Sequence, residues 1–577
     1  MNKHTIARAA VSAGLAVAMT LGSVAPATVA LAADDDSTIT IRNVAPNETS
    51  FKGYQIFKAT VADKDGGKSV SNVDWANKDV KDAVEGVIKA QDANYKGTTA
   101  QDAADWITAN VTGTTKETAV ASDSVAEAIA KAVMGKTEQT TVTGGQQSDA
   151  LESGYWLFVT NRGSVDSGTT DNPKNTETYT SPIFAVVGGS AYTVTEKASV
   201  PTVEKKIVSD ADGKEYDAAD SHVGQDVTYN IYGTVAQDFA TYDSYSYVFT
   251  DNVSEGLTVN EGSVKVYMYA SEEAAKADLT HTKGTNVTSN FAKDLGAAKD
   301  DGSKDLTVTA KTTDGAKGLK SIDGATKDSC FVVTYTATIN SKAVIGNDGN
   351  PNTVKLTYSN NPNADGTGDT VPDTVRDFTY ALNLVKLDQG TEKALDGATF
   401  TITVKSVDDK DKSSVGKYVK ADGTLTNKVD EAKLTTKDGA AINVRGLDAG
   451  TYTVTEESAP TGYTKVAPFD FTIDPTIDET SQKVTKLEST LDTKDADHVK
   501  AGLVDSTSTK GDNVLTMQAD SGVSENKTVN ITVGDVKSVG LPLTGQAGIG
   551  VTLAAGGAVL AIGVYRVVRS RREQDAE

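Results

Sequence analysis

Hydrophobic and polar residues alternate along most of this chain. Two clear examples are residues 226–232, DVTYNIY, and residues 398–404, ATFTITV. Successive side chains of an extended strand point to opposite faces, so period-two runs bounded by Gly, Asn and Asp predict antiparallel sandwiches. We therefore expect a mainly β fold built from tandem immunoglobulin-like β-sandwich domains.

The first section of the chain departs from this pattern. Two groups of apolar residues recur there at helical spacing: Val80, Val84, Val87 and Ile88, and then Val125, Ile129 and Val133. Asp123 and Ser124 directly precede the second group and are both good helix caps. The N-terminal domain is therefore expected to be α+β, with helices inserted among its strands.

The length of 577 residues is too great for one hydrophobic core and indicates about three domains. A Val-Pro step suggests one boundary near Pro201, and the turn-rich region 359–373 suggests another just after it, near Asp377. The expected division of the chain is 1–33, 34–198, 199–378, 379–540 and 541–577.

Composition excludes several kinds of chemistry. The net charge of −23 argues against nucleic acid, which rewards clustered Lys and Arg. The four histidines are scattered and show no ligand spacing, so we expect no metal site, no cofactor and no His-based catalysis. The single cysteine, Cys330, rules out an intrachain disulfide.

Both ends of the chain carry export signals. Residues 1–33 combine Lys3 and Arg8, an apolar run and a small-residue cleavage site, which is typical of a secretory signal peptide. Residues 547–568 are almost wholly apolar, long enough to cross a bilayer, and are followed by an arginine-rich tail. We therefore expect a secreted protein with a C-terminal transmembrane segment.

A pentapeptide just before that apolar segment resembles the L-P-x-T-G sorting signal of Gram-positive surface proteins. It consists of Leu541, Pro542, Leu543, Thr544 and Gly545. The resemblance implies that a sortase cuts between Thr544 and Gly545, leaves Thr544 as an acyl donor to an amine, and anchors the protein to cell-wall peptidoglycan.

Between the two ends the chain resembles the backbone pilins of Gram-positive bacteria. Residues 379–535 resemble the collagen-adhesin B-type fold, with LNLVKLD, GATFTI and the E-box phrase YTVTEESAPTGY. Residues 199–378 resemble the second domain of these pilins, with PTVEKKIV, FTDNVSEGLTV and NTVKLTYSNNP. The resemblance implies the shaft subunit of a sortase-assembled pilus, or fimbrium.

The stretch YTVTE occurs at residues 192–196 and again at 452–456. Alternation directs the glutamate of each copy toward the apolar side and directs Lys197, which follows the first copy, toward water. Lys197 stands where backbone pilins carry the lysine that attacks the acyl-enzyme, and a solvated lysine keeps a pKa near 10.4. We expect Lys197 to join Thr544 of the next subunit, with Lys205 and Lys206 as alternatives.

The same resemblance implies intramolecular isopeptide bonds, and burial supplies the chemistry. A lysine attacks only when neutral, and an apolar environment lowers its pKa while raising that of a nearby carboxyl group. In the middle domain alternation turns Lys205 inward and Lys206 outward. We predict a bond from Lys205 to Asn352 assisted by Asp251, with Asn350 as the alternative partner.

The third domain departs from the family at this point. The collagen-adhesin B-type fold usually ends in an asparagine a few residues before the sorting signal, whereas Asp535 stands here and Asn530 lies five residues upstream. A protonated aspartic acid can react with loss of water in place of ammonia. We predict a bond from Lys386 to Asp535 assisted by Glu456, over a bond to Asn530 or no bond.

Two functions from different classes fit these features, and neither is that of an enzyme acting on external substrates. The first is a polymerised shaft subunit whose partners are sortases, other copies of itself and minor pilins. The alternative is a monomeric wall-anchored protein that takes part in cell adhesion by binding a host ligand. No aromatic cluster stands out that would identify such a ligand.

Overall fold

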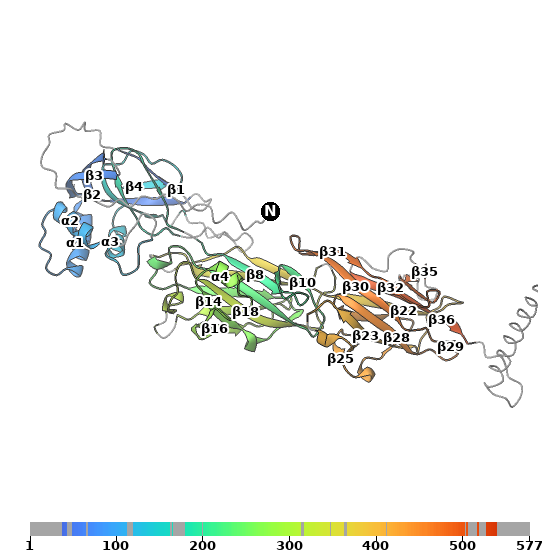
Figure 1. Cartoon of the computed structure of the whole chain (residues 1–577). Helices are drawn as coiled ribbons and strands as arrows, with labels where there is room; N and C mark the ends of the chain where they lie inside the picture. The colour runs from blue at the N-terminus through green and yellow to red at the C-terminus, as the bar shows by residue number, and fades with distance from the viewer. Residues whose placement is uncertain are drawn as a thin grey trace, which may run out of the picture.

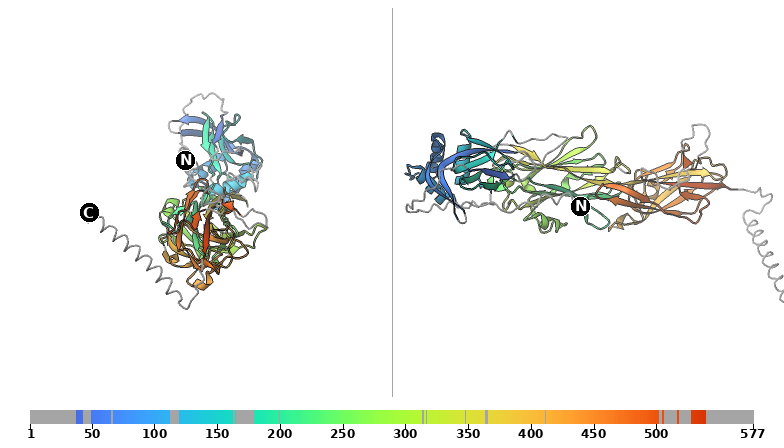
Figure 2. Two further views of the ribbon diagram at one scale, coloured as in Figure 1. Left: turned by 90° about the vertical axis from the view of Figure 1, so that its right-hand side faces the viewer. Right: turned by 90° about the horizontal axis from the view of Figure 1, so that it is seen from above.

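The computed structural model describes residues 37–42, 49–64, 67–111, 119–161, 164, 179–198, 200–312, 315, 317–346, 348–362, 366–410, 412–501, 504–505, 516–517 and 527–538. Its sheets fall into three groups that follow one another along an elongated molecule (Figures 1 and 2). The mainly β fold with tandem immunoglobulin-like domains is therefore confirmed. None of the helices in the described part is long and apolar enough to cross a membrane.

The first group combines strands and helices. A five-stranded sheet runs in the order β3-β2-β5-β6, with β4 beside β2. Its strands are β2 (Ser50–Lys64), β3 (Gly67–Trp75), β4 (Thr140–Thr143), β5 (Gly154–Thr160) and β6 (Ile183–Val187). The parallel pair β1 (Ile39–Arg42) and β7 (Tyr192–Thr195) packs on one of its faces.

Three helices cover the other face of that sheet: α1 (Lys78–Gln91), α2 (Ala100–Asn110) and α3 (Val125–Met134). The two predicted helices, α1 and α3, are confirmed, and the Ser124 hydroxyl caps α3 by accepting a hydrogen bond from the Glu127 amide. The sequence analysis missed α2 because its buried face is largely alanine, which gives little hydrophobic contrast.

The second group is a sandwich of two seven-stranded sheets. One contains β10 (Ala218–Asp220), β12 (Tyr247–Val253), β16 (Phe291–Leu295), β17 (Lys304–Ala310), β19 (Asn350–Ser359), β20 (Thr367–Asp369) and β21 (Asp373–Phe378). The other contains β8 (Val203–Val208), β9 (Glu215–Tyr216), β11 (Asp226–Thr234), β13 (Leu257–Val259), β14 (Lys265–Tyr269), β15 (Thr285–Asn286) and β18 (Cys330–Ile339).

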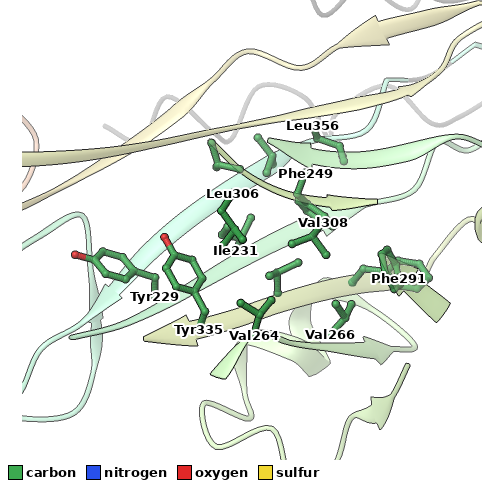
Figure 3. Close-up of a cluster of buried hydrophobic side chains, with 14 of the residues drawn as sticks. Tyr229, Ile231, Phe249, Val264, Val266, Phe291, Leu306, Val308, Tyr335 and Leu356 are labelled. Carbon is green, nitrogen blue, oxygen red and sulfur yellow. The ribbon is translucent and has the colours of Figure 1, made fainter. Parts of the chain in front are cut away.

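The core of this sandwich lies between the two sheets. Side chains from both sheets interleave there, among them Ile231 and Phe249, as Figure 3 shows. A short helix, α4 (Glu272–Lys276), packs beside β14, β11 and β18 on the outside of the second sheet. The alternating burial of β8, β12 and β19 places every second residue in the core, which is how polar side chains on these strands come to face one another.

The third group is a second sandwich. One sheet holds β22 (Tyr380–Asp388), β27 (Ile442–Leu447), β29 (Tyr463–Thr464), β33 (Val499–Ala501) and β36 (Thr528–Lys537). The other holds β23 (Thr399–Val407), β24 (Tyr418–Val419), β25 (Leu425–Thr426), β26 (Leu434–Thr435), β28 (Gly450–Ser458), β30 (Phe469–Asp478), β31 (Lys483–Glu488) and β32 (Leu491–Asp492). A separate pair joins β34 (Val504–Asp505) to β35 (Thr516–Met517).

Candidate functional site

Two clusters of buried polar side chains lie inside the second and third sandwiches, and each is centred on a lysine. In the second sandwich Lys205 lies on β8 and is completely buried. Its neighbour Lys206 faces outward and forms an ion pair with Asp217. The strand therefore separates the two lysines as its alternation predicts, and burial prevents Lys205 from reaching another molecule.

The ammonium group of Lys205 meets an acid from the opposite sheet. Its Nζ lies 2.5 Å from both carboxylate oxygens of Asp251, which belongs to β12 and is 1% exposed. The hydroxyl of Tyr335 accepts a hydrogen bond from Nζ at 3.1 Å and donates one to Asp251 at 2.6 Å. Lysine, acid and hydroxyl therefore form a closed triangle in the core.

Asn352 joins the cluster through the same hydroxyl. Its Nδ2 donates a hydrogen bond to the Tyr335 oxygen at 2.6 Å, while its Oδ1 is buried with no hydrogen-bond partner among the described residues. The alternative residue Asn350 is held elsewhere, because its amide oxygen accepts from the Val344 backbone and its Nδ2 donates to the Asp377 carbonyl. Asn352, and not Asn350, shares the Lys205 site.

Burial dominates the electrostatics of this cluster. Loss of hydration lowers the pKa of Lys205 to about 8, although the nearby Asp251 carboxylate opposes the shift. The Lys205 ammonium lies 5.2 Å from the ring centroids of both Tyr229 and Tyr335, whose rings stack side by side (Figure 3). Burial also raises the pKa of Tyr335 well above its usual range, so its hydroxyl keeps its proton.

The sequence analysis did not single out Tyr229 and Tyr335. They are register partners on β11 and β18, and each occupies a buried position of an alternating strand. A tyrosine at such a position signals a hydroxyl that needs a buried partner. The hydrogen bond between the Tyr335 hydroxyl and Lys205 could not be predicted without knowing which strands are neighbours.

The third sandwich holds a similar cluster. Lys386 on β22, Glu456 on β28 and Asp535 on β36 all have side chains with no exposed surface. Lys386 Nζ donates to Glu456 at 3.0 Å and contacts Asp535 directly, and it lies 5.5 Å from the centroid of the Phe400 ring. Glu456 comes from one sheet and the other two residues come from the facing sheet.

The parallel pairing of β22 with β36 decides which side chain meets the lysine. Lys386 is level with Val533, and Asp535 lies two residues further along on the same side. Asn530 is level with Asn383, whose Nδ2 donates a hydrogen bond to the Asn530 side-chain oxygen at 3.1 Å. The structure thus brings Asp535, and not Asn530, to Lys386.

Burial raises the pKa of Glu456 and the pKa of Asp535, although the Lys386 ammonium acts in the opposite direction on both. The negative charge of Asp535 adds to the increase at Glu456. Lys386 Nζ lies 3.0 Å from Glu456 Oε1, whereas Asp535 Oδ2 lacks a hydrogen-bond partner in the described part of the chain. These conditions favour a proton on one of the two acids.

Lys197 requires a correction. It was expected to face water with an ordinary pKa, but it is half-buried, and this burial lowers its pKa. A neighbouring segment packs against the chain at this point, because the fully buried Thr180 accepts a hydrogen bond from the Lys197 backbone amide at 2.8 Å. The preceding Glu196 does point inward, as its alternation predicts.

The sorting signal is not part of this description. Leu541, Pro542, Leu543, Thr544 and Gly545, the signal peptide and the apolar segment 547–568 lie outside the described residues. The predicted linkage between Lys197 and Thr544 therefore rests on the sequence alone.

Each cluster brings a lysine amine into one buried site together with a carboxyl or carboxamide group that can acylate it. Such proximity supplies effective molarities on the order of 10⁵–10⁸ M. An adjacent acid can accept and return the proton that the transfer requires. The arrangement is therefore suited to a single amide-forming event within the chain.

Part of the third sandwich matches a known protein family. Residues 381–489 match the family model described as SpaA, a prealbumin-like fold domain. The chain is similar to Gram-positive backbone pilins. A curated relative, the trypsin-resistant surface T6 protein of Streptococcus pyogenes serotype M6, is 27% identical over 284 residues. That alignment covers 46% of this chain and 44% of the relative, so it spans less than half of the relative's length.

Two solved structures are also similar to the chain. The T6 backbone pilin of serotype M6 Streptococcus pyogenes is 18% identical, with a TM-score of 0.47, and the match covers 88% of this chain and all of that one. The full-length major pilin SpaD from Corynebacterium diphtheriae is 17% identical, with a TM-score of 0.40, and the match covers 87% of this chain and 98% of that one.

Proposed function

We propose that this protein is the shaft subunit of a covalent pilus on the surface of a Gram-positive bacterium. A sortase joins Thr544 of one subunit to Lys197 of the next, and a second, wall-anchoring step attaches the polymer to peptidoglycan. The protein acts as structural material and not as an enzyme on external substrates. The observation that carries this proposal is the pair of buried lysine clusters, each spanning the two sheets of its sandwich.

The proposed reaction in the third sandwich forms an amide and releases water. Neutral Lys386 Nζ attacks Cγ of protonated Asp535, the new C–N bond replaces the C–OH bond, and the hydroxyl leaves as water with a proton from the amine. Glu456 Oε2, which is held by the Val466 amide at 2.9 Å, is positioned to carry that proton.

The proposed reaction in the second sandwich forms an amide and releases ammonia. Neutral Lys205 Nζ attacks Cγ of Asn352, and the amide nitrogen leaves as ammonia with the proton that Asp251 takes from the amine. The shared Tyr335 hydroxyl holds both reacting groups. Each bond would join two strands that are far apart in the sequence, β8 to β19 in the second sandwich and β22 to β36 in the third. A pulling force would then act on a covalent bond and not only on the hydrogen bonds between strands.

The half-burial of Lys197 supports its role as the intermolecular nucleophile, because loss of hydration lowers its pKa and so increases the neutral fraction. Lys206 is less suited to this role. Although its burial opposes the change, ion pairs with Asp217 and Glu204 raise its pKa and occupy its ammonium group.

The test is the covalent state of the protein on the cell. Boiled cell-wall extracts should show a ladder of multimers, and Lys197→Ala should collapse the ladder to a monomer while Lys206→Ala leaves it intact. A single band that neither change affects would support the alternative, a monomeric wall-anchored adhesin. A ladder that disappears only with Lys206→Ala would reassign the linkage lysine.

A further inference from the structure

A group of acidic side chains lies where the second sandwich meets the third. Asp210 follows β8 in the second sandwich, Asp409 follows β23 in the third, and Asp448 lies between β27 and β28. One carboxylate oxygen from each lies within 4.8 Å of those from the other two. The cluster therefore draws its members from both sides of the junction.

The backbone fixes this junction around the acids. The amide of Lys410 donates a hydrogen bond to the Asp210 carbonyl at 2.9 Å, and the Val223 amide donates one to the Gly446 carbonyl at 2.9 Å. Gly446 has a φ of 76°, and a Cβ there would lie 2.2 Å from the Val223 side chain. The two sandwiches approach each other closely, so the acids cannot separate without breaking these contacts.

Two of the three acids are buried, and Asp210, which accepts a hydrogen bond from Gln225, is half-buried. Asp409 is 7% exposed and Asp448 is 2% exposed. No ion pair joins Asp210, Asp409 or Asp448 to a lysine, arginine or histidine within the part of the chain that the structure describes. Buried carboxylates at such spacing repel one another, and each loses its hydration.

The hydrogen bonding of Asp448 is a second, separate observation. Its Oδ1 accepts a hydrogen bond from the Ala449 amide at 2.8 Å, but its Oδ2 is buried with no partner among the described residues. A buried carboxylate oxygen that nothing satisfies is costly and calls for a bound cation or a proton.

We propose that Asp210, Asp409 and Asp448 bind a divalent cation, namely calcium, across the junction of the second and third sandwiches. Carboxylate oxygens are hard ligands, and an all-oxygen set suits calcium or magnesium better than zinc, iron or copper. Calcium is favoured over magnesium because it accepts irregular geometry from loops and loses its water more readily.

The sequence analysis expected no metal site because it considered only ligands at short, regular spacing in the sequence. These three acids are far apart in the sequence and meet only because two domains pack end to end. A cation there would connect ligands from both sandwiches, remove the repulsion between them and hold the junction in one orientation. The site is independent of the covalent links, so it would stiffen an isolated subunit as well as a polymer.

The test is calcium binding to the purified protein after treatment with a chelator. Calorimetric titration with calcium chloride should show one site per chain with a Kd of at most the order of 10⁻³ M, the weak limit for extracellular modules. Calcium should also raise the thermal unfolding temperature. Asp448→Asn should raise the Kd for calcium at least about tenfold, which corresponds to a loss of about 1.4 kcal/mol of binding free energy.

The matched control is Asp408→Asn, because Asp408 is an exposed acid beside Asp409 and should not affect binding. If Asp448→Asn fails to fold, Asp409→Asn is tested against the same control. Absence of binding at millimolar calcium, or equal affinity in the Asp448→Asn and Asp408→Asn proteins, would overturn the proposal. Equal affinity for magnesium and calcium would overturn the assignment to calcium.

Discussion

Asp535 contacts the ammonium group of Lys386 although the parallel-strand partner of Lys386 is Val533. A shift of two residues keeps a side chain on the same face of the sheet, so the acid reaches the lysine along that face. The lysine is thus presented with the acid Asp535 and not with the amide of Asn530. This relationship fixes the leaving group of the proposed reaction.

The leaving group can be changed by mutation. The intact mass of the protein should be lower than the sequence mass by one water from Lys386–Asp535 and one ammonia from Lys205–Asn352. Asp535→Asn should still react but lose two ammonia molecules, because the amide has nearly the same shape as the acid. Asp535→Ala should lose one ammonia only. Mass spectrometry of the unfolded protein measures these deficits, and an Asp535→Ala deficit equal to that of the wild type would refute the assignment.

Glu456 should be needed for the bond in the third sandwich. Glu456→Gln removes the group that carries the proton, so we expect a chain that lacks the water loss and keeps the ammonia loss. Glu457→Gln is a matched control, because Glu457 is exposed and accepts a hydrogen bond from Thr401 on the other face of the strand. A normal water loss in the Glu456→Gln protein would show that this glutamate is only structural.

Loss of that bond should reduce stability. Lys386 and Asp535 are 149 residues apart, and by analogy with disulfides a link that closes such a loop removes unfolded-state entropy worth about 5 kcal/mol. The unreacted Glu456→Gln protein should therefore unfold with a free energy lower by about 2–5 kcal/mol for the third sandwich, as denaturant titration measures. A stability within about 1 kcal/mol of the Glu457→Gln control would contradict the link.

Local pattern was sufficient for some of these features and insufficient for others. The alternating pattern alone predicted that Lys205 and Glu456 face inward, because the buried face of a strand can be recognised without knowing its neighbouring strands. The choice of Asp535 over Asn530 depends on the register of β36 against β22, and the half-burial of Lys197 depends on a segment that crosses it. Tyr335 and the acids at the junction were missed for the same reason, since their significance comes from contacts distant in sequence.

The Tyr335 hydroxyl should control the reaction in the second sandwich. Tyr335→Phe keeps the ring but removes the oxygen that binds both Lys205 and Asn352. We expect the ammonia loss to become slow or incomplete in freshly folded protein, as followed by intact mass over time. Tyr247→Phe is the matched control, because Tyr247 is a buried tyrosine of the same core whose hydroxyl donates to the Thr234 carbonyl. An equal rate in both variants would refute a role for the hydroxyl.

An unreacted Lys205 should make stability depend on pH in an unusual direction. Asn352→Ala removes the acceptor and leaves the buried amine, whose pKa falls from 10.5 to about 8 because of burial. Between these values the unfolded chain binds a proton that the folded chain does not, so the free energy of unfolding should rise as pH increases from about 8 to about 10.5. The full change is about 3 kcal/mol, and the penalty is fully present below pH 8. The double variant Asn352→Ala with Lys205→Met carries every other titrating group but lacks this amine, so its denaturant titrations should show no such rise. Identical pH profiles for the two variants would mean that the buried lysine keeps an ordinary pKa.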